Sequence, residues 1–216
     1  MGKAKVKRAS TSIDMTAMCD VSFLLLTFFV LTATARQPEV LVVDTPASTS
    51  PEKLPDDGLG IISVADGKIF FAVKNPEVRE ITLKNISQKY NVNFSADEYA
   101  KFKQLDEFGV PIKNLRQLLS LNNDERTAEI QPGIPVDSTE TNSNELYSWV
   151  QEARKATIEF NRSREDEKGF EDPGPMKVAI KADAEEKYPI ISMIIETLRN
   201  QKQNKFSFVT GLRHEG

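Results

Sequence analysis

The sequence has almost no cysteine or histidine, since each occurs once in 216 residues. The single thiol, Cys19, cannot form an intrachain disulfide, so disulfide-based redox chemistry is excluded. One cysteine and one histidine, His214, are also too few for a zinc site or a thiol-protease site on one chain. No Ser/His/Asp arrangement and no paired carboxylates can be argued from the spacing. We therefore expect no enzymatic activity, no bound metal and no cofactor.

The body of the chain lacks an excess of positive charge. The net charge of the whole chain is −4, and the first twelve residues carry four cations and no acid, so the remaining 204 residues carry −8. The four cations are Lys3, Lys5, Lys7 and Arg8. An acidic body argues against nucleic acid as a partner.

One long apolar segment is present, at residues 15–35. As an α-helix these residues would span about 31 Å, which matches the roughly 30 Å hydrocarbon core of a bilayer. Four cations precede the segment, whereas only Arg36 follows it closely. By the positive-inside rule, this asymmetry predicts a cytoplasmic N-terminus and a translocated C-terminal body.

A single carboxylate, Asp20, interrupts the apolar segment. A charged side chain there costs about 2.5 to 3.5 kcal/mol on insertion scales, so we expect it to face protein or water, or to be protonated. At about 100° per residue, Thr16, Thr27 and Thr34 lie within roughly 40° of Asp20 on a helix. This polar stripe predicts a protein-facing seam that could carry a proton. The alternative is that the hydroxyls satisfy their own backbone and Asp20 only packs.

The main alternative for the N-terminus is a cleaved signal peptide. A basic start, the apolar run 21–31 and the Ala33-Thr34-Ala35 triplet fit that pattern. Against cleavage, an acid lies directly before the run, and the apolar segment reaches membrane length once residues 15–18 are included. We therefore expect an uncleaved membrane helix.

Motifs at both ends of the chain resemble the ExbD/TolR family. The matching residues are Ile13-Asp14-Met15-Thr16, Asp20-Val21, the run 23–29, Leu31-Thr32, Ile180-Lys181-Ala182-Asp183, Tyr188-Pro189 and the segment ending at Leu198. Asp20 falls in register with the family's single membrane carboxylate. The chain departs from the family pattern at Ala17, where proline is common, and at Cys19.

The resemblance implies a subunit of a proton-driven motor in a bacterial inner membrane, with a periplasmic C-terminal domain. It implies that Asp20 carries the proton, that an ExbB/TolQ-like multi-helix protein is the partner, and that a TonB- or TolA-like transducer receives the work. It also implies a homodimer, with contact to the cell wall as in TolR-like relatives. The stretch 44–48 favours an ExbD-like role over a TolR-like role in envelope integrity. A rival hypothesis is a signal-anchored periplasmic binding protein.

We divide the chain by composition and pattern into a tail, an anchor, a linker and a domain. The boundaries are 1–14 for the basic cytoplasmic tail, 15–35 for the transmembrane helix, 36–59 for a linker with a short strand at 39–44, and 60–216 for the periplasmic domain, with a helical insertion at about 75–135. The predicted fold class is α+β, with one transmembrane helix followed by a mixed α/β domain.

Local signals predict several elements of the domain. Strands 61–65 and 68–73 flank Asp66-Gly67, a typical hairpin turn. Ser95 and Glu98 form a capping box before one helix, and Pro111 begins another, after an earlier short helix carrying Leu83, Ile86 and Tyr90. Asn142-Ser143-Asn144-Glu145 is expected to form another N-cap with a reciprocal Glu, before a long helix ending near residue 164. The charged stretch 163–175 lacks EF-hand spacing, and we interpret it as a solvated loop.

The last segment predicts a strand, a helix and a returning strand. Apolar residues alternate along 176–182, Pro189 begins an amphipathic helix, and residues 206–209 return as a strand. We expect one core to contain Val178, Ile180, Ile194, Leu198 and Phe208.

Overall fold

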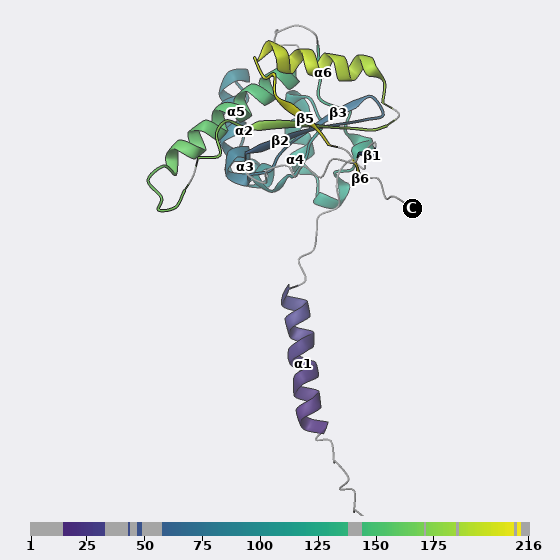
Figure 1. Ribbon diagram of the computed structural model, residues 1–216, viewed down its shortest axis with the longest axis vertical. Helices are drawn as coiled ribbons and strands as arrows, with labels where there is room; N and C mark the ends of the chain where they lie inside the picture. The colour runs from purple at the N-terminus through teal and green to yellow at the C-terminus, as the bar shows by residue number, and fades with distance from the viewer. Residues whose placement is uncertain are drawn as a thin grey trace, which may run out of the picture. The chain divides into compact units, whose positions relative to one another are not determined.

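The computed structural model describes residues 15–32, 43, 47–48, 58–137, 144–170, 172–184, 186–209 and 211–212. The chain divides into two compact units, Met1–Pro38 and Glu39–Gly216. The first unit contains an apolar helix, and the second combines helices with a small mixed sheet (Figure 1). The predicted fold class is therefore confirmed.

The apolar segment forms α1, Met15–Thr32, a helix of 18 residues. At about 1.5 Å per residue its length is about 27 Å, close to the hydrocarbon thickness of a bilayer. Within the described part of the chain, α1 is the one helix that is long and apolar enough to cross a membrane. Residues 33–35, the predicted end of the segment, lie outside the described residues.

Four strands form the main sheet, in the order β3-β2-β4-β5. β2 (Leu59–Ala65) pairs antiparallel with β3 (Lys68–Val73), β4 (Lys177–Ala182) lies parallel to β2, and β5 (Phe206–Phe208) lies parallel to β4. The turn residues Asp66 and Gly67 have φ values of 53° and 72°. Positive φ at both positions matches the twist of the flanking strands. The predicted hairpin is confirmed.

A second, two-stranded sheet joins the linker to the C-terminal end of the domain. β1 (Ala47–Ser48) pairs parallel with β6 (Gly211–Leu212). Of the strand expected at 39–44, only Val43 is described, and Val43 is not in a strand. The other residues of that expected strand lie outside the described residues.

The segment predicted as a helical insertion contains three α-helices. These are α2 (Pro76–Tyr90), α3 (Ala96–Gln104) and α4 (Leu115–Ser120), with short 3-10 turns at Ile112–Asn114, Asn123–Glu125 and Ala128–Ile130. The capping box is confirmed, because Glu98 N donates to Ser95 Oγ at 3.3 Å and Ser95 N donates to Glu98 Oε2 at 2.6 Å. α2 is capped by the Asn75 side chain, which accepts bonds from Glu77 N and Val78 N.

The insertion helices share one hydrophobic core with the sheet. Phe102 of α3 stacks on Trp149 at a centroid distance of 5.8 Å, and Phe108 meets the same indole edge-on at 4.6 Å. Phe108 also pairs with Phe71 of β3 through two backbone hydrogen bonds of 2.8 and 3.1 Å. Because these aromatic side chains are buried together, α2, α3 and α4 belong to the core of the domain.

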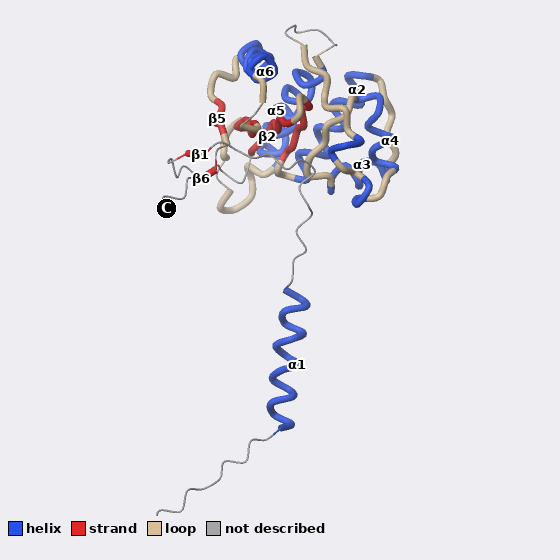
Figure 2. The backbone as a smooth tube through the Cα atoms, turned by 90° about the vertical axis from the view of Figure 1, so that its right-hand side faces the viewer, coloured by secondary structure: helices blue, strands red, loops and turns tan. Residues whose placement is uncertain are grey.

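The core lies on the face of the sheet that carries Ile62, Val64, Phe71 and Ile180, where the side chains of the helices pack. Two further helices complete this layer: α5 (Glu145–Ser163) and α6 (Tyr188–Asn200). Figure 2 shows α6 beside β5 at one side of the domain, with α2, α3 and α4 gathered at the other.

The N-cap of α5 lies within the predicted segment 142–145, of which residues 142 and 143 lie outside the described residues. The cap is Asn144, whose Oδ1 accepts a bond from Tyr147 N at 2.9 Å. Glu145, however, makes no reciprocal bond to the cap, because it is the first residue of the helix and a capping box needs the acid at the third position. Its Oε2 instead accepts a bond from Ile112 N at 2.7 Å.

The strand–helix–strand unit at the C-terminal end is confirmed as β4, α6 and β5, but the predicted core has one error. Val178, Ile180, Ile194 and Leu198 are at most 1% exposed and share the core, whereas Phe208 is 52% exposed. β5 is the edge strand of the sheet, so it has a neighbouring strand on one side only. Phe206, two residues earlier, packs against the core instead.

Candidate functional site

The sixth residue of α1 is Asp20, and it is the one charged side chain among the 18 residues of this helix. Its side chain is exposed, as are those of the apolar residues that surround it. No side chain of α1 is buried within the chain. Among the described residues, none covers the Asp20 carboxylate.

Helical geometry from Met15 to Thr32 places Thr16, Asp20 and Thr27 on one side of α1 at about 100° per residue. Thr27 Oγ1 donates to the Leu24 carbonyl at 2.9 Å, so its proton is used by its own helix while its oxygen can still accept a bond. Thr34, the fourth member of the predicted stripe, lies outside the described residues.

Backbone bonding of this kind recurs along α1. Ser22 Oγ donates to Met18 O at 2.8 Å, and Thr32 Oγ1 donates to Phe28 O at 2.7 Å. The hydroxyls of Ser22, Thr27 and Thr32 thus satisfy themselves locally, which leaves Asp20 as the group whose placement the helix does not explain.

Titratable groups of the second unit are used to join helices. Tyr90 Oη of α2 donates to Ser148 Oγ of α5 at 2.8 Å, and burial raises the pKa of this phenol although the hydrogen bond opposes the shift. Burial lowers the pKa of Lys89, against the attraction of Glu152 at 4.0 Å. Within the described ranges, no group of three or more His, Cys, Asp or Glu residues could hold a metal ion.

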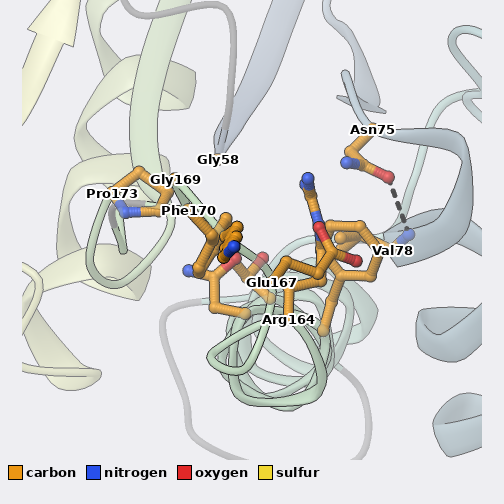
Figure 3. A pocket seen from close by; sticks show the side chains of 12 residues that line it. Gly58, Asn75, Val78, Arg164, Glu167, Gly169, Phe170 and Pro173 are labelled. Atoms are coloured by element: carbon orange, nitrogen blue, oxygen red, sulfur yellow. Dashed lines mark hydrogen bonds and ion pairs between the residues drawn. The ribbon is translucent and has the colours of Figure 1, made fainter.

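A polar pocket of about 330 Å³ opens where the C-terminal end of α5 meets the start of α2 (Figure 3). It is lined by Gly58, Asn75, Val78, Thr157, Phe160, Asn161, Arg164, Glu167, Lys168, Gly169, Phe170 and Pro173. The stretch 163–175, expected to be a solvated loop, supplies part of this lining, and the sequence pattern did not predict a pocket there. The available sequence signal for the pocket was the pair of phenylalanines, Phe160 and Phe170, on either side of Arg164. The sequence alone does not show that both rings contact the Arg164 guanidinium, as they do in the fold.

The second unit has an α+β fold, and the first contains a helix long and apolar enough to cross a membrane, with one carboxylate in it. The family model of the biopolymer transport protein ExbD/TolR matches residues 6–212 of the chain. The chain therefore belongs to the ExbD/TolR family. Comparison with curated proteins and with solved structures gives no match.

Family membership extends the resemblance from motifs at the two ends of the chain to residues 6–212, nearly the whole chain. The matched range includes 75–135, about which the resemblance of the two ends said nothing. Members are non-enzymatic subunits of biopolymer transport systems, and membership implies a stator-type role beside an ExbB/TolQ-type partner.

Proposed function

We propose that this protein is an ExbD-like stator subunit that uses the proton-motive force to energise TonB-dependent transport across the outer membrane. The observation that carries the proposal is Asp20, a lone carboxylate in the membrane-length helix of an ExbD/TolR family member. Protonation and release at this carboxylate would drive the helix relative to its partner.

Energetics support a mobile proton at this position. Each elementary charge that crosses the membrane yields about 2.3 kcal/mol per 100 mV, so successive protons supply useful work. A permanently charged acid facing lipid would instead cost about 2.5 to 3.5 kcal/mol. Both terms favour a carboxylate that faces the partner and changes its protonation state. Thr16, Thr27 and Thr34 would assist along the same stripe.

We further propose that α1 spans the inner membrane once, with residues 1–14 in the cytoplasm and the domain from residue 60 in the periplasm. The excess of cations before α1 supports this orientation. The family resemblance also supports a homodimer beside an ExbB-like channel protein.

The second candidate is a TolR-like subunit that maintains envelope integrity through a TolA-like transducer and contacts the cell wall. It shares the membrane chemistry and differs in the transducer. The stretch 44–48, which resembles ExbD-like members, favours the transport role. The third candidate is a periplasmic binding protein for which α1 is only a membrane anchor. An anchor needs no carboxylate, so this candidate does not explain Asp20.

Purification of the tagged full-length chain in mild detergent tests the proposal. We expect a multi-helix membrane protein of the ExbB/TolQ type to co-purify. The control is a chain in which residues 15–32 are replaced by an apolar helix of equal length without Asp20 or the threonines; this chain should reach the membrane but lose the partner. Recovery of the same partners with both chains would reduce α1 to an anchor.

The role of the transducer is tested in cells that lack the protein. Loss of energy-dependent uptake through outer-membrane receptors, with normal resistance to detergent, supports the ExbD-like role. Detergent sensitivity with normal uptake supports the TolR-like role instead.

A further inference from the structure

The pocket at the end of α5 contains an arginine that an ion pair and two aromatic rings contact, while its two outer nitrogen atoms make no hydrogen bond to a described residue. Arg164 Nε donates to Glu167 Oε2 at 2.9 Å. The guanidinium carbon lies 4.8 Å from the centroid of the Phe170 ring and 5.5 Å from that of Phe160. Among the described residues, no acceptor binds Nη1 or Nη2 of Arg164. The side chain of Arg164 is 39% exposed, so these two parallel donors are accessible to a ligand from solvent.

Neighbouring amides in the pocket are also held in place. Asn75 Oδ1 accepts bonds from Glu77 N at 2.9 Å and Val78 N at 3.2 Å, so its Nδ2 is turned away from α2 (Figure 3). Asn161 is 6% exposed, and its Nδ2 donates to Asp172 Oδ1 at 2.7 Å and to Gly174 O at 3.2 Å. Both amides are oriented by the fold before any ligand arrives, which lowers the entropy cost of binding.

The charges that line the pocket favour an anion. Arg164 and Lys168 are cationic and Glu167 is the one acid in the lining, while Glu165 and Asp166 are exposed nearby without lining it. The net charge of the lining is therefore positive. The surrounding acids would repel a doubly charged phosphate more strongly than a singly charged carboxylate.

We propose that this pocket binds the carboxylate of a small organic acid that also carries an apolar group. The carboxylate accepts two parallel bonds from Nη1 and Nη2 of Arg164, in the fork geometry that guanidinium and carboxylate share. Asn75 Nδ2 and Lys168 supply further donors, and the apolar group lies against Phe170 and Pro173. A cavity of about 330 Å³ is at the small end of ligand sites, which suits a small molecule. This site is separate from Asp20 and goes beyond the proposed function.

Saturation-transfer NMR on the full-length chain in detergent micelles tests the proposal. The probe is N-acetyl-leucine, and its uncharged analogue N-acetyl-leucinamide controls for size and for apolar partition into the micelle. We expect saturable transfer to the acid and no saturable transfer to the amide. Equal signals from both would overturn the proposal, and so would displacement of the acid by an equal concentration of inorganic phosphate.

Three variants locate the binding. Arg164→Gln should weaken binding of N-acetyl-leucine at least tenfold. Asn75→Asp keeps the cap of α2, because aspartate accepts the same two amide bonds, but it puts a negative charge where the donor was and should weaken binding as strongly without lowering the melting temperature. The matched control is Arg116→Gln, since Arg116 also pairs with a glutamate and lies over a phenylalanine ring, yet it lines no described pocket. Wild-type binding by Asn75→Asp, or an equal loss in Arg116→Gln, would contradict the site.

Discussion

Glu145 is a half-buried acid whose ionisation the fold disfavours. Burial raises the pKa of its carboxyl group, and the hydrogen bond from Ile112 N together with the nearby Lys113 opposes that shift. An acid whose pKa is raised by folding stabilises the fold at low pH and loses that contribution as the pH rises through its folded pKa. Glu145 therefore makes the domain less stable at neutral pH than a neutral side chain of the same shape would.

We predict that Glu145→Gln raises the free energy of unfolding at pH 7 by up to about 1 kcal/mol, a value kept small by the partial solvation of the carboxylate. The amide oxygen still accepts the bond from Ile112 N. Urea unfolding of a soluble fragment that begins at Glu39 should show this gain at pH 7 and no difference between the proteins below pH 4. A gain that did not change with pH would show that the charge is not the cause.

Arg79 is a buried arginine whose role could not be predicted from the sequence. It is 6% exposed and donates to Val73 O at 2.6 Å, to Leu105 O at 2.8 Å and to Asp106 Oδ1 at 2.8 Å, among other acceptors. These acceptors lie as far as 27 positions away in the chain. On an exposed helix the same arginine would be a solvated cation. In this fold it is buried and joins the end of β3 to the end of α3 through hydrogen bonds.

Elements with a local cause were predictable. The hairpin turn depends on positive φ at Asp66 and Gly67, the start of α3 on the reciprocal bonds of Ser95 and Glu98, and the start of α6 on Pro189. Each of these signals involves residues within three positions of one another. Phe208, by contrast, was placed wrongly, because whether a strand lies at an edge depends on the order of all the strands.

The core of the β4–α6–β5 unit gives a direct prediction. Ile194 and Leu198 are fully buried, so truncating either to alanine removes apolar contacts and leaves a cavity, at a cost of about 2 to 5 kcal/mol. Phe208→Ala should cost much less, because more than half of that side chain is already exposed. Thermal unfolding of the soluble fragment checks the order, and an equal loss from Phe208→Ala would mean that β5 is covered in solution.

The stator role requires one orientation of the chain in the membrane. We predict that the N-terminus is cytoplasmic, that α1 is not cleaved, and that residues after about 37 are periplasmic, from the asymmetry of lysine and arginine around α1. Protease added to cells with a permeabilised outer membrane should digest the domain and spare a short N-terminal fragment. A mature protein that begins at Arg36 would contradict the stator role.

One of the two candidate sites could be predicted from the sequence, and the other could not. Asp20 was found because an acid in an apolar helix is anomalous by itself, whatever surrounds it. The pocket beside Arg164 was not found, because its walls come from Gly58, the start of α2, the end of α5 and the loop after α5, and no local pattern brings these segments together.

Two substitutions on α1 separate the proton from the structure. Asp20→Asn preserves the shape and much of the hydrogen bonding of the side chain but cannot exchange a proton. Thr27→Val removes a hydroxyl on the same side of the helix, whose proton bonds to Leu24 O, and should reduce work output much less.

The most direct test of the central claim is energy-dependent uptake in cells that express Asp20→Asn at the wild-type level, with partner co-purification measured in parallel. We predict that Asp20→Asn retains insertion and the ExbB/TolQ-type partner but loses uptake, while Thr27→Val keeps most of it. Full uptake by Asp20→Asn would contradict the account, because α1 would then be an anchor and the lone carboxylate would have no part in the work.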